Sequence, residues 1–109
     1  MRDDQVYLLH IRDACSRIIT YTGRGEQTFL SDTLVQDAVL RNLEVIGEAV
    51  KNLSDGFKNA HTEVEWRRIA GMRDRLIHGY FGVNMQIVWQ VVIRDIPPLQ
   101  KQMERYLRD

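Results

Sequence analysis

Several features are scarce in this chain of 109 residues, and each shortage excludes a class of protein. A single cysteine, Cys15, excludes an internal disulfide and a cysteine-based zinc site. No apolar run approaches the ~20 residues that span a bilayer, and the polar N-terminus predicts no signal peptide, so we expect a cytoplasmic protein with no membrane segment. Basic and acidic residues number 15 each, which excludes a globally basic nucleic-acid binder but not a local basic patch.

What the chain does contain is typical of one globular domain over residues 1–109. Hydrophobic residues make up 44% of it and charged residues 28%, a balance that favours a folded core over a disordered tail. A domain of this length buries somewhat under roughly 70% of the surface that its unfolded chain exposes. Association with a second copy would therefore add stability.

Apolar residues recur at helical spacing in four segments, over about 4–21, 31–53, 66–80 and 85–107. Ser31 and Asn84 are the predicted N-caps of the second and fourth helices, and Thr62-x-x-Glu65 reads as a capping box for the third. Asp55-Gly56 is a stop signal. These segments predict an all-α, antiparallel up-down four-helix bundle, which we favour over an extended coiled coil.

The only two prolines, Pro97 and Pro98, are adjacent inside the last segment. Each lacks the N–H that its turn of helix would use, so we expect the last helix to be kinked there. Cys15 falls on an apolar stripe and is a better core residue than a nucleophile.

Arg73 interrupts an apolar stripe, seven residues after Trp66 and seven before Tyr80, so the three share one face. Its guanidinium always carries charge and has five donors to satisfy. One interpretation is a structural ion pair with Glu44 or Glu48 of the second helix. The other is an anion site, because a guanidinium matches phosphate oxygens in a two-pronged geometry.

His78 follows Arg73 by five residues, which is about 140° around an ideal helix. Gly79 comes next, so the helix could end there and free the ring to turn. A lone histidine near a helix end is usually a packing or capping residue. Beside an arginine and a tyrosine it becomes a candidate for proton transfer near neutral pH.

Other polar residues near this pair have both structural and functional readings. Asn42 is either a buried amide bonded across the bundle or a group that holds Arg73 or the ligand. Three further arginines are either a solvated face or a local source of positive charge for RNA, namely Arg67, Arg68 and Arg75. No Glu-x-x-His pair, histidine ligand spacing or glycine-rich phosphate loop is present, so we expect neither a metal nor a cofactor.

The run from Arg73 to Tyr80 resembles the Arg-x-x-x-x-His-x-Tyr motif of the HEPN superfamily. Four other runs are similar to one branch of it, the HepT-type toxins of HepT–MntA toxin–antitoxin pairs: residues 41–49 (RNLEVIGEA), 81–84 (FGVN), 87–89 (IVW) and 95–99 (DIPPL). The resemblance covers almost the whole chain. It implies a small helical bundle that forms a homodimer or a larger oligomer and cleaves RNA, with transfer RNA as a substrate class, without a metal.

The resemblance also implies a partner and a modification. In this type VII toxin–antitoxin system the antitoxin is a nucleotidyltransferase that uses ATP to transfer AMP onto the motif tyrosine, here Tyr80. On this view His78 is the general base or acid for attack by the RNA 2′-hydroxyl, and Arg73 stabilises charge on the phosphoryl oxygens. Asp74, directly after the motif arginine, is a possible helper that could equally pair with Arg75.

Two other functions compete with a ribonuclease. The chain could be a non-catalytic helical binding module that positions a nucleotidyltransferase, with Arg73 and His78 as a structural pair. It could also be a purely structural helical dimer, which predicts neither RNA cleavage nor adenylylation. RNA cleavage by the unmodified chain separates the first reading from both alternatives.

Overall fold

The computed structural model describes residues 2–78 and 84–108, together with their side chains except at positions 2, 3, 73 and 76–78. These residues form helices and no strand, which confirms the all-α prediction. None of the described helices is long and apolar enough to cross a membrane. The helices are α1 (Arg2–Tyr21), α2 (Glu26–Ser31), α3 (Thr33–Asn52), α4 (Asp55–Ala60), α5 (Trp66–His78), α6 (Met85–Arg94) and α7 (Ile96–Arg108).

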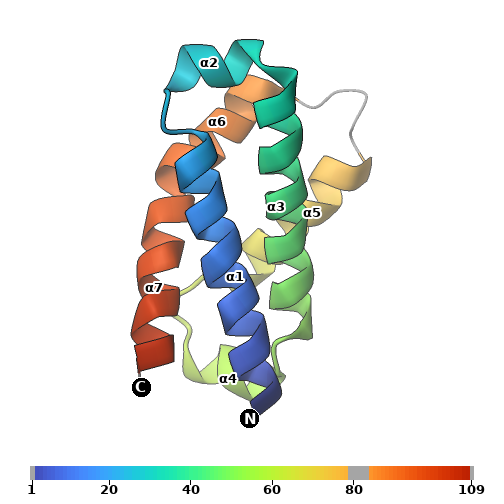
Figure 1. Cartoon of the computed structure of the whole chain (residues 1–109). Coiled ribbons are helices and arrows are strands. Elements are labelled where there is room, and N and C mark those ends of the chain that lie inside the picture. The colour runs from blue at the N-terminus through green and yellow to red at the C-terminus, as the bar shows by residue number, and fades with distance from the viewer. Residues whose placement is uncertain (1, 79–83, 109) are drawn as a thin grey trace.

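The long helices run alternately up and down the molecule (Figure 1). Helix α1 packs between α3 and α7, and α3 packs on its other side against α5. Helices α6 and α7 follow one another and form the fourth arm of the bundle, while the short helices α2 and α4 lie at opposite ends. The predicted antiparallel up-down bundle is confirmed.

The apolar stripes predicted from the sequence meet in the centre of the bundle. Ile11, Ile18, Leu43, Ile46 and Met103 are fully buried there. Cys15 lies among them, and burial raises the pKa of its thiol to about 12. The thiol is therefore protonated and inert at neutral pH, as expected of a core cysteine.

The start of α3 differs from the prediction. Asp32 caps this helix, because its carboxylate accepts hydrogen bonds from the backbone N–H of Leu34 at 3.0 Å and of Val35 at 3.3 Å. Ser31, the predicted cap, is instead the last residue of α2, and its hydroxyl donates to the carbonyl of Gln27. The prediction was wrong because the chain forms one more short helix before α3 begins.

The connection from α3 to α5 also contains a short helix, α4, which begins at the Asp55-Gly56 pair that was predicted only as a stop signal. Helix α3 ends at Asn52, and Ser54 then caps α4 by accepting from the N–H of Phe57 at 3.1 Å. The expected capping box at Thr62 was wrong, since α5 begins four residues later at Trp66. The predicted cap of the fourth helix is confirmed, because Asn84 accepts from Gln86 and Ile87 at the start of α6.

The predicted kink separates α6 from α7, where the axis bends by 40° at residue 95. Pro97 and Pro98 lie in the first turn of α7, where a missing N–H costs little. In a continuous helix the N–H groups of residues 97 and 98 would donate to the carbonyls of Ile93 and Arg94. Proline has no N–H, so these two hydrogen bonds cannot form and the helix breaks just before the prolines.

Asp4 ties the start of α1 to the junction of α3 and α4. Its buried carboxylate accepts from the backbone N–H of Ser54 at 2.8 Å and from the Ser54 hydroxyl at 2.7 Å. Burial alone would raise the pKa of Asp4, but these hydrogen bonds to its charged form outweigh it and the pKa is lowered.

We expect Asp4→Asn to lower the free energy of unfolding by about 1–2 kcal/mol at pH 7, because charge-assisted hydrogen bonds are lost. A carboxyl whose folded pKa is lowered stabilises the fold above its unfolded pKa of about 3.9 and loses that contribution as pH falls further. The difference from wild type should therefore shrink below about pH 4. Urea titrations at a series of pH values measure it, with the exposed Asp37→Asn as control; a gap that is constant with pH would contradict the assignment.

Candidate active site

The helix α5 carries the Arg73…His78 motif in its last two turns. It is continuous from Trp66 to His78, so positions 73 and 78 lie about 140° apart around one helix. Within one chain, the backbone thus presents the two motif positions on different sides of α5. The side chains of Arg73 and His78 lie outside the described part of the structure, as does Tyr80 in the segment 79–83, so their predicted roles stay predictions.

Asp74, the proposed helper, links α5 to α3. Its carboxylate lies 2.8 Å from Nζ of Lys51, in the last turn of α3. The two side chains are 45% and 40% exposed, so the pair contributes no more than about 1 kcal/mol to stability. The pair matters mainly for position, because it holds α5 against the end of α3 at the residue that directly follows Arg73. Sequence alone raised Arg75 as a partner and gave no sign of Lys51, which is 23 residues away.

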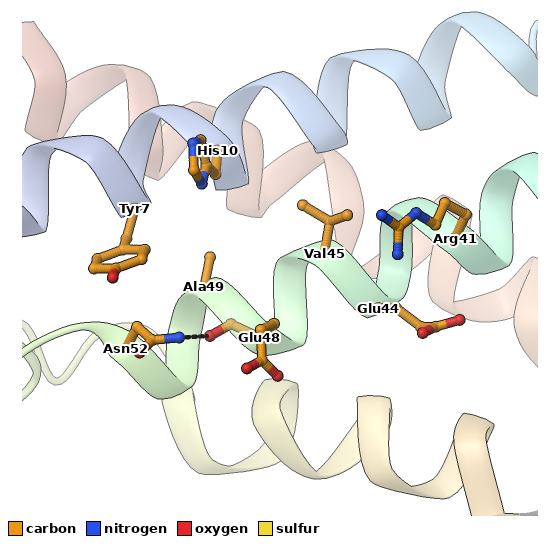
Figure 2. Close-up of a pocket in the computed structure, with 8 residues that line it drawn as sticks. All are labelled: Tyr7, His10, Arg41, Glu44, Val45, Glu48, Ala49 and Asn52. Carbon is orange, nitrogen blue, oxygen red and sulfur yellow. Dashed lines mark hydrogen bonds between the residues drawn. The ribbon is translucent and has the colours of Figure 1, made fainter.

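Glu44 and Glu48, the predicted partners of Arg73, project from α3 beside a shallow pocket of about 240 Å³ (Figure 2). The carboxylate of Glu48 points toward the ribbon of α5, which packs against α3. His10 lines this pocket from α1, across from the two carboxylates, and Arg41 lines it from α3 beside Glu44. The arrangement is compatible with a carboxylate facing position 73, and the pairing itself stays a prediction.

Asn42 is buried in α3, with 7% of its surface exposed. Its amide donates to the carbonyl of Ala38, one turn earlier in the same helix, at 2.8 Å. The predicted burial is confirmed, whereas the hydrogen bond found is local and does not cross the bundle. A catalytic role for Asn42 is not tested by this contact.

Arg68 holds α5 to the bend between α6 and α7. Its two terminal nitrogens donate to the two carboxylate oxygens of Asp95 at 3.2 and 2.8 Å, and Nε donates to Glu65 at 3.0 Å. A guanidinium makes this forked contact and an ammonium cannot. Arg68 thus has a structural role in addition to the predicted one toward RNA.

The other two arginines proposed for RNA binding, Arg67 and Arg75, are exposed on α5. The ion pairs that the structure shows among its described side chains involve neither of them. Over 13 residues α5 has four arginines and a single carboxylate, that of Asp74. The helix that carries the motif is therefore strongly basic in a chain of zero net charge.

An aromatic cluster at the α4 end of the bundle went unnoticed in the sequence. The centroid of the His61 ring lies 4.3 Å from that of the Phe57 ring and 4.5 Å from that of the Tyr106 ring. The hydroxyl of Tyr106 donates to Glu63. The pKa of Tyr106 is raised, mainly by burial and next by this hydrogen bond. Nε1 of Trp66 donates to the His61 carbonyl at 2.8 Å. The cluster anchors the start of α5 to α7, and only the aromatic residue types hinted at it.

Within residues 2–78 and 84–108, no three His, Cys, Asp or Glu side chains gather closely enough to hold a metal ion. His10 lies on α1 and His61 directly after α4, so neither belongs to α5. His78 is thus the histidine that the fold places on the basic helix.

Comparison with known proteins identifies the family. The family model described as "HepT-like: Ribonuclease HepT-like" matches residues 11–106. The chain belongs to the HepT-like ribonuclease family. "Probable ribonuclease HepT" of Thermococcus cleftensis is 44% identical over 95% of this chain and 96% of its own length.

Two further relatives of this HepT-like chain are similar over nearly its full length. A protein of Caldanaerobacter subterraneus subsp. tengcongensis with the name "Putative RNase TTE0752" is 44% identical over 99% of this chain and 97% of its own. One of Methanocaldococcus jannaschii, "Putative RNase MJ0127", is 42% identical over 99% and 90%. No solved structure matches the chain.

If Arg68 acts mainly as a structural tie, Arg68→Lys should destabilise the protein by about 0.5–1 kcal/mol, since an ammonium loses the forked contact to Asp95. Arg67→Lys, the matched control one residue away, should leave stability within about 0.5 kcal/mol of wild type. Chemical unfolding of both variants measures the difference. Equal stability of the two variants would refute the structural role.

Proposed function

We propose that this HepT-like chain is the toxin of a toxin–antitoxin pair and a metal-independent endoribonuclease whose working groups are Arg73 and His78. The observation that carries the proposal is the family match over residues 11–106, because it spans a basic, continuous α5 with both motif positions. Transfer RNA in the cytoplasm is the proposed substrate.

The proposed reaction needs only groups that the chain can supply. A histidine takes the proton of the RNA 2′-hydroxyl, whose oxygen attacks the adjacent phosphorus. The bond from phosphorus to the 5′-oxygen breaks, and a protonated histidine gives that oxygen its proton. Arg73 stabilises the negative charge on the phosphoryl oxygens during this exchange. The products are a 2′,3′-cyclic phosphate and a 5′-hydroxyl.

A homodimer is part of the proposal. Positions 73 and 78 lie about 140° apart around α5, and one α5 helix carries a single histidine for a reaction that needs both a base and an acid. Two copies with their α5 helices facing would place two arginines and two histidines around one cleft, with one histidine as base and the other as acid. The small bundle also leaves large apolar side chains exposed outside α5, such as Leu34 of α3, at 78%, and Ile87 of α6, at 63%, which association would help to cover.

The proposed control is adenylylation of Tyr80 by a nucleotidyltransferase antitoxin. ATP is used by that partner, and this chain needs no cofactor. AMP on Tyr80, two residues after His78, would add bulk and negative charge beside the motif and repel the RNA phosphate.

Purified, unmodified protein should cleave transfer RNA in the presence of EDTA, whereas His78→Ala and Arg73→Ala should lose at least about 100-fold in rate, the usual size of one acid–base or charge-stabilising group. His10→Ala and Arg24→Ala are the matched controls and should cleave at the wild-type rate. Denaturing gels and detection of the cyclic phosphate measure the outcome. Cleavage by both motif variants at the wild-type rate would remove this site assignment, and an inactive wild type would favour a non-catalytic module that positions the transferase.

Incubation with the cognate nucleotidyltransferase and ATP should add AMP to Tyr80 and abolish RNA cleavage. Tyr80→Phe should accept no AMP, while Tyr21→Phe, an exposed tyrosine on α1, should accept it like wild type. Intact-mass and peptide mass spectrometry locate the group. Modification that persists in Tyr80→Phe would contradict the assigned acceptor.

A further inference from the structure

A groove of about 780 Å³ lies between the end of α3, helix α4 and the first turns of α5. Its floor is apolar and is formed by Val50, Val64, Trp66 and Ala70. Four cations surround this floor against two carboxylates, those of Asp55 and Glu65. The cations are Lys51, Lys58, Arg67 and Arg68.

The cations of the groove differ in how fully they are neutralised. Lys51 and Arg68 are held by carboxylates at 2.8 Å. Lys58 lies 4.0 Å from Asp55, whose side chain is 97% exposed, and its Nζ also donates to the carbonyl of Val50 at 3.3 Å. Arg67 takes part in none of the ion pairs among the described residues. A weak, exposed pair does little to screen a charge. Arg67 is therefore available to an external anion, while Lys58, with 22% of its side chain exposed, brings positive charge to the edge of the groove.

The groove continues toward the motif along one face of α5. Arg67, Gly71, Asp74 and His78 follow one another at spacings of four, three and four residues, so their positions form a single row on the helix. A Cβ placed on Gly71 would meet no described atom within 4 Å beyond its chain neighbours and the backbone of its own helix. Positions 67 and 74 lie roughly 10 Å apart along the helix. Gly71 lies between them and has no side chain, so the row is open at its middle.

The chemistry of this path suits single-stranded RNA. Proteins bind such strands with cations on the phosphates and apolar surface under the bases, and with polar groups on base edges and 2′-hydroxyls. Asn59 and Thr62 supply polar side chains at the groove beside Lys58.

We propose that this groove binds the RNA segment next to the cleaved phosphate, with Lys58 and Arg67 on its phosphates, and that the strand crosses Gly71 to reach the motif. The inference rests on the proposed ribonuclease function and extends it to residues of α4 and to Gly71. Lys51 and Arg68 keep the walls in place through their ion pairs.

Gly71 offers the sharpest test. Gly71→Gln and Gly71→Glu put side chains of equal size into open space, and both remove a helix-destabilising glycine, so neither should impair folding. The charge of the Glu variant would repel a strand that passes there. Lys58→Gln, Arg67→Gln and Asn59→Asp probe the groove itself, and Lys101→Gln and Arg24→Gln remove exposed cations elsewhere.

The measurement is fluorescence anisotropy of a labelled single-stranded RNA of about 12 nucleotides, with every variant made in a His78→Ala background to prevent cleavage. We expect the groove variants to bind about threefold to tenfold more weakly, with Gly71→Glu well below Gly71→Gln. Each lost phosphate contact should reduce the salt slope of log affinity by about 0.7. The two control variants should bind like the parent protein, and thermal melts confirm that all are folded.

The outcomes separate the groove from the ribonuclease function. If the wild type cleaves RNA but the groove and Gly71→Glu variants bind like the parent, the groove proposal is overturned and the function stands. Equal losses in the groove variants and the controls also overturn it, because they reflect overall charge. If the wild type neither cleaves nor binds RNA, both proposals fail together.

Discussion

The packing of α5 against α3 is the contact on which the candidate site depends. A helix of 13 residues with four arginines has too little apolar surface to be stable alone, and isolated helices of this length are marginal in water. Its buried side, with Trp66, Ile69 and Met72, supplies the attachment. Polar contacts to Lys51 and Asp95 then fix its rotation. Arg67, Arg68 and Arg75 are left exposed on the other side of α5, and the first two of them line the groove.

The sequence predicted the long helices and the bundle well because each needs only a local apolar stripe. It failed where two local signals compete or where a helix is too short for a stripe. Ser31 and Asp32 are both good caps, and only the extra helix α2 decides between them. Helices α2 and α4 have six residues each, less than two full turns, so no periodicity announces them.

The candidate site divides in the same way. The motif Arg73…His78…Tyr80 could be read directly from its spacing and from the family resemblance. Contacts between distant segments could not, since nothing in the sequence pairs Lys51 with Asp74 or Arg68 with Asp95. The second of these pairs gives a residue predicted for RNA a structural partner. A contiguous patch of positive charge depends on which neighbours neutralise each arginine, and that is decided by tertiary packing alone.

The buried thiol of Cys15 is a natural probe of whether the core of the bundle is closed. The chain has one thiol, and in the folded protein it is fully covered and protonated. A thiol reagent in solution can therefore react only with molecules whose central helices have come apart. The rate of labelling counts openings of the core and is blind to fraying at the surface. Because no second cysteine competes for the reagent, opening of the core can be followed in the natural sequence without an engineered probe.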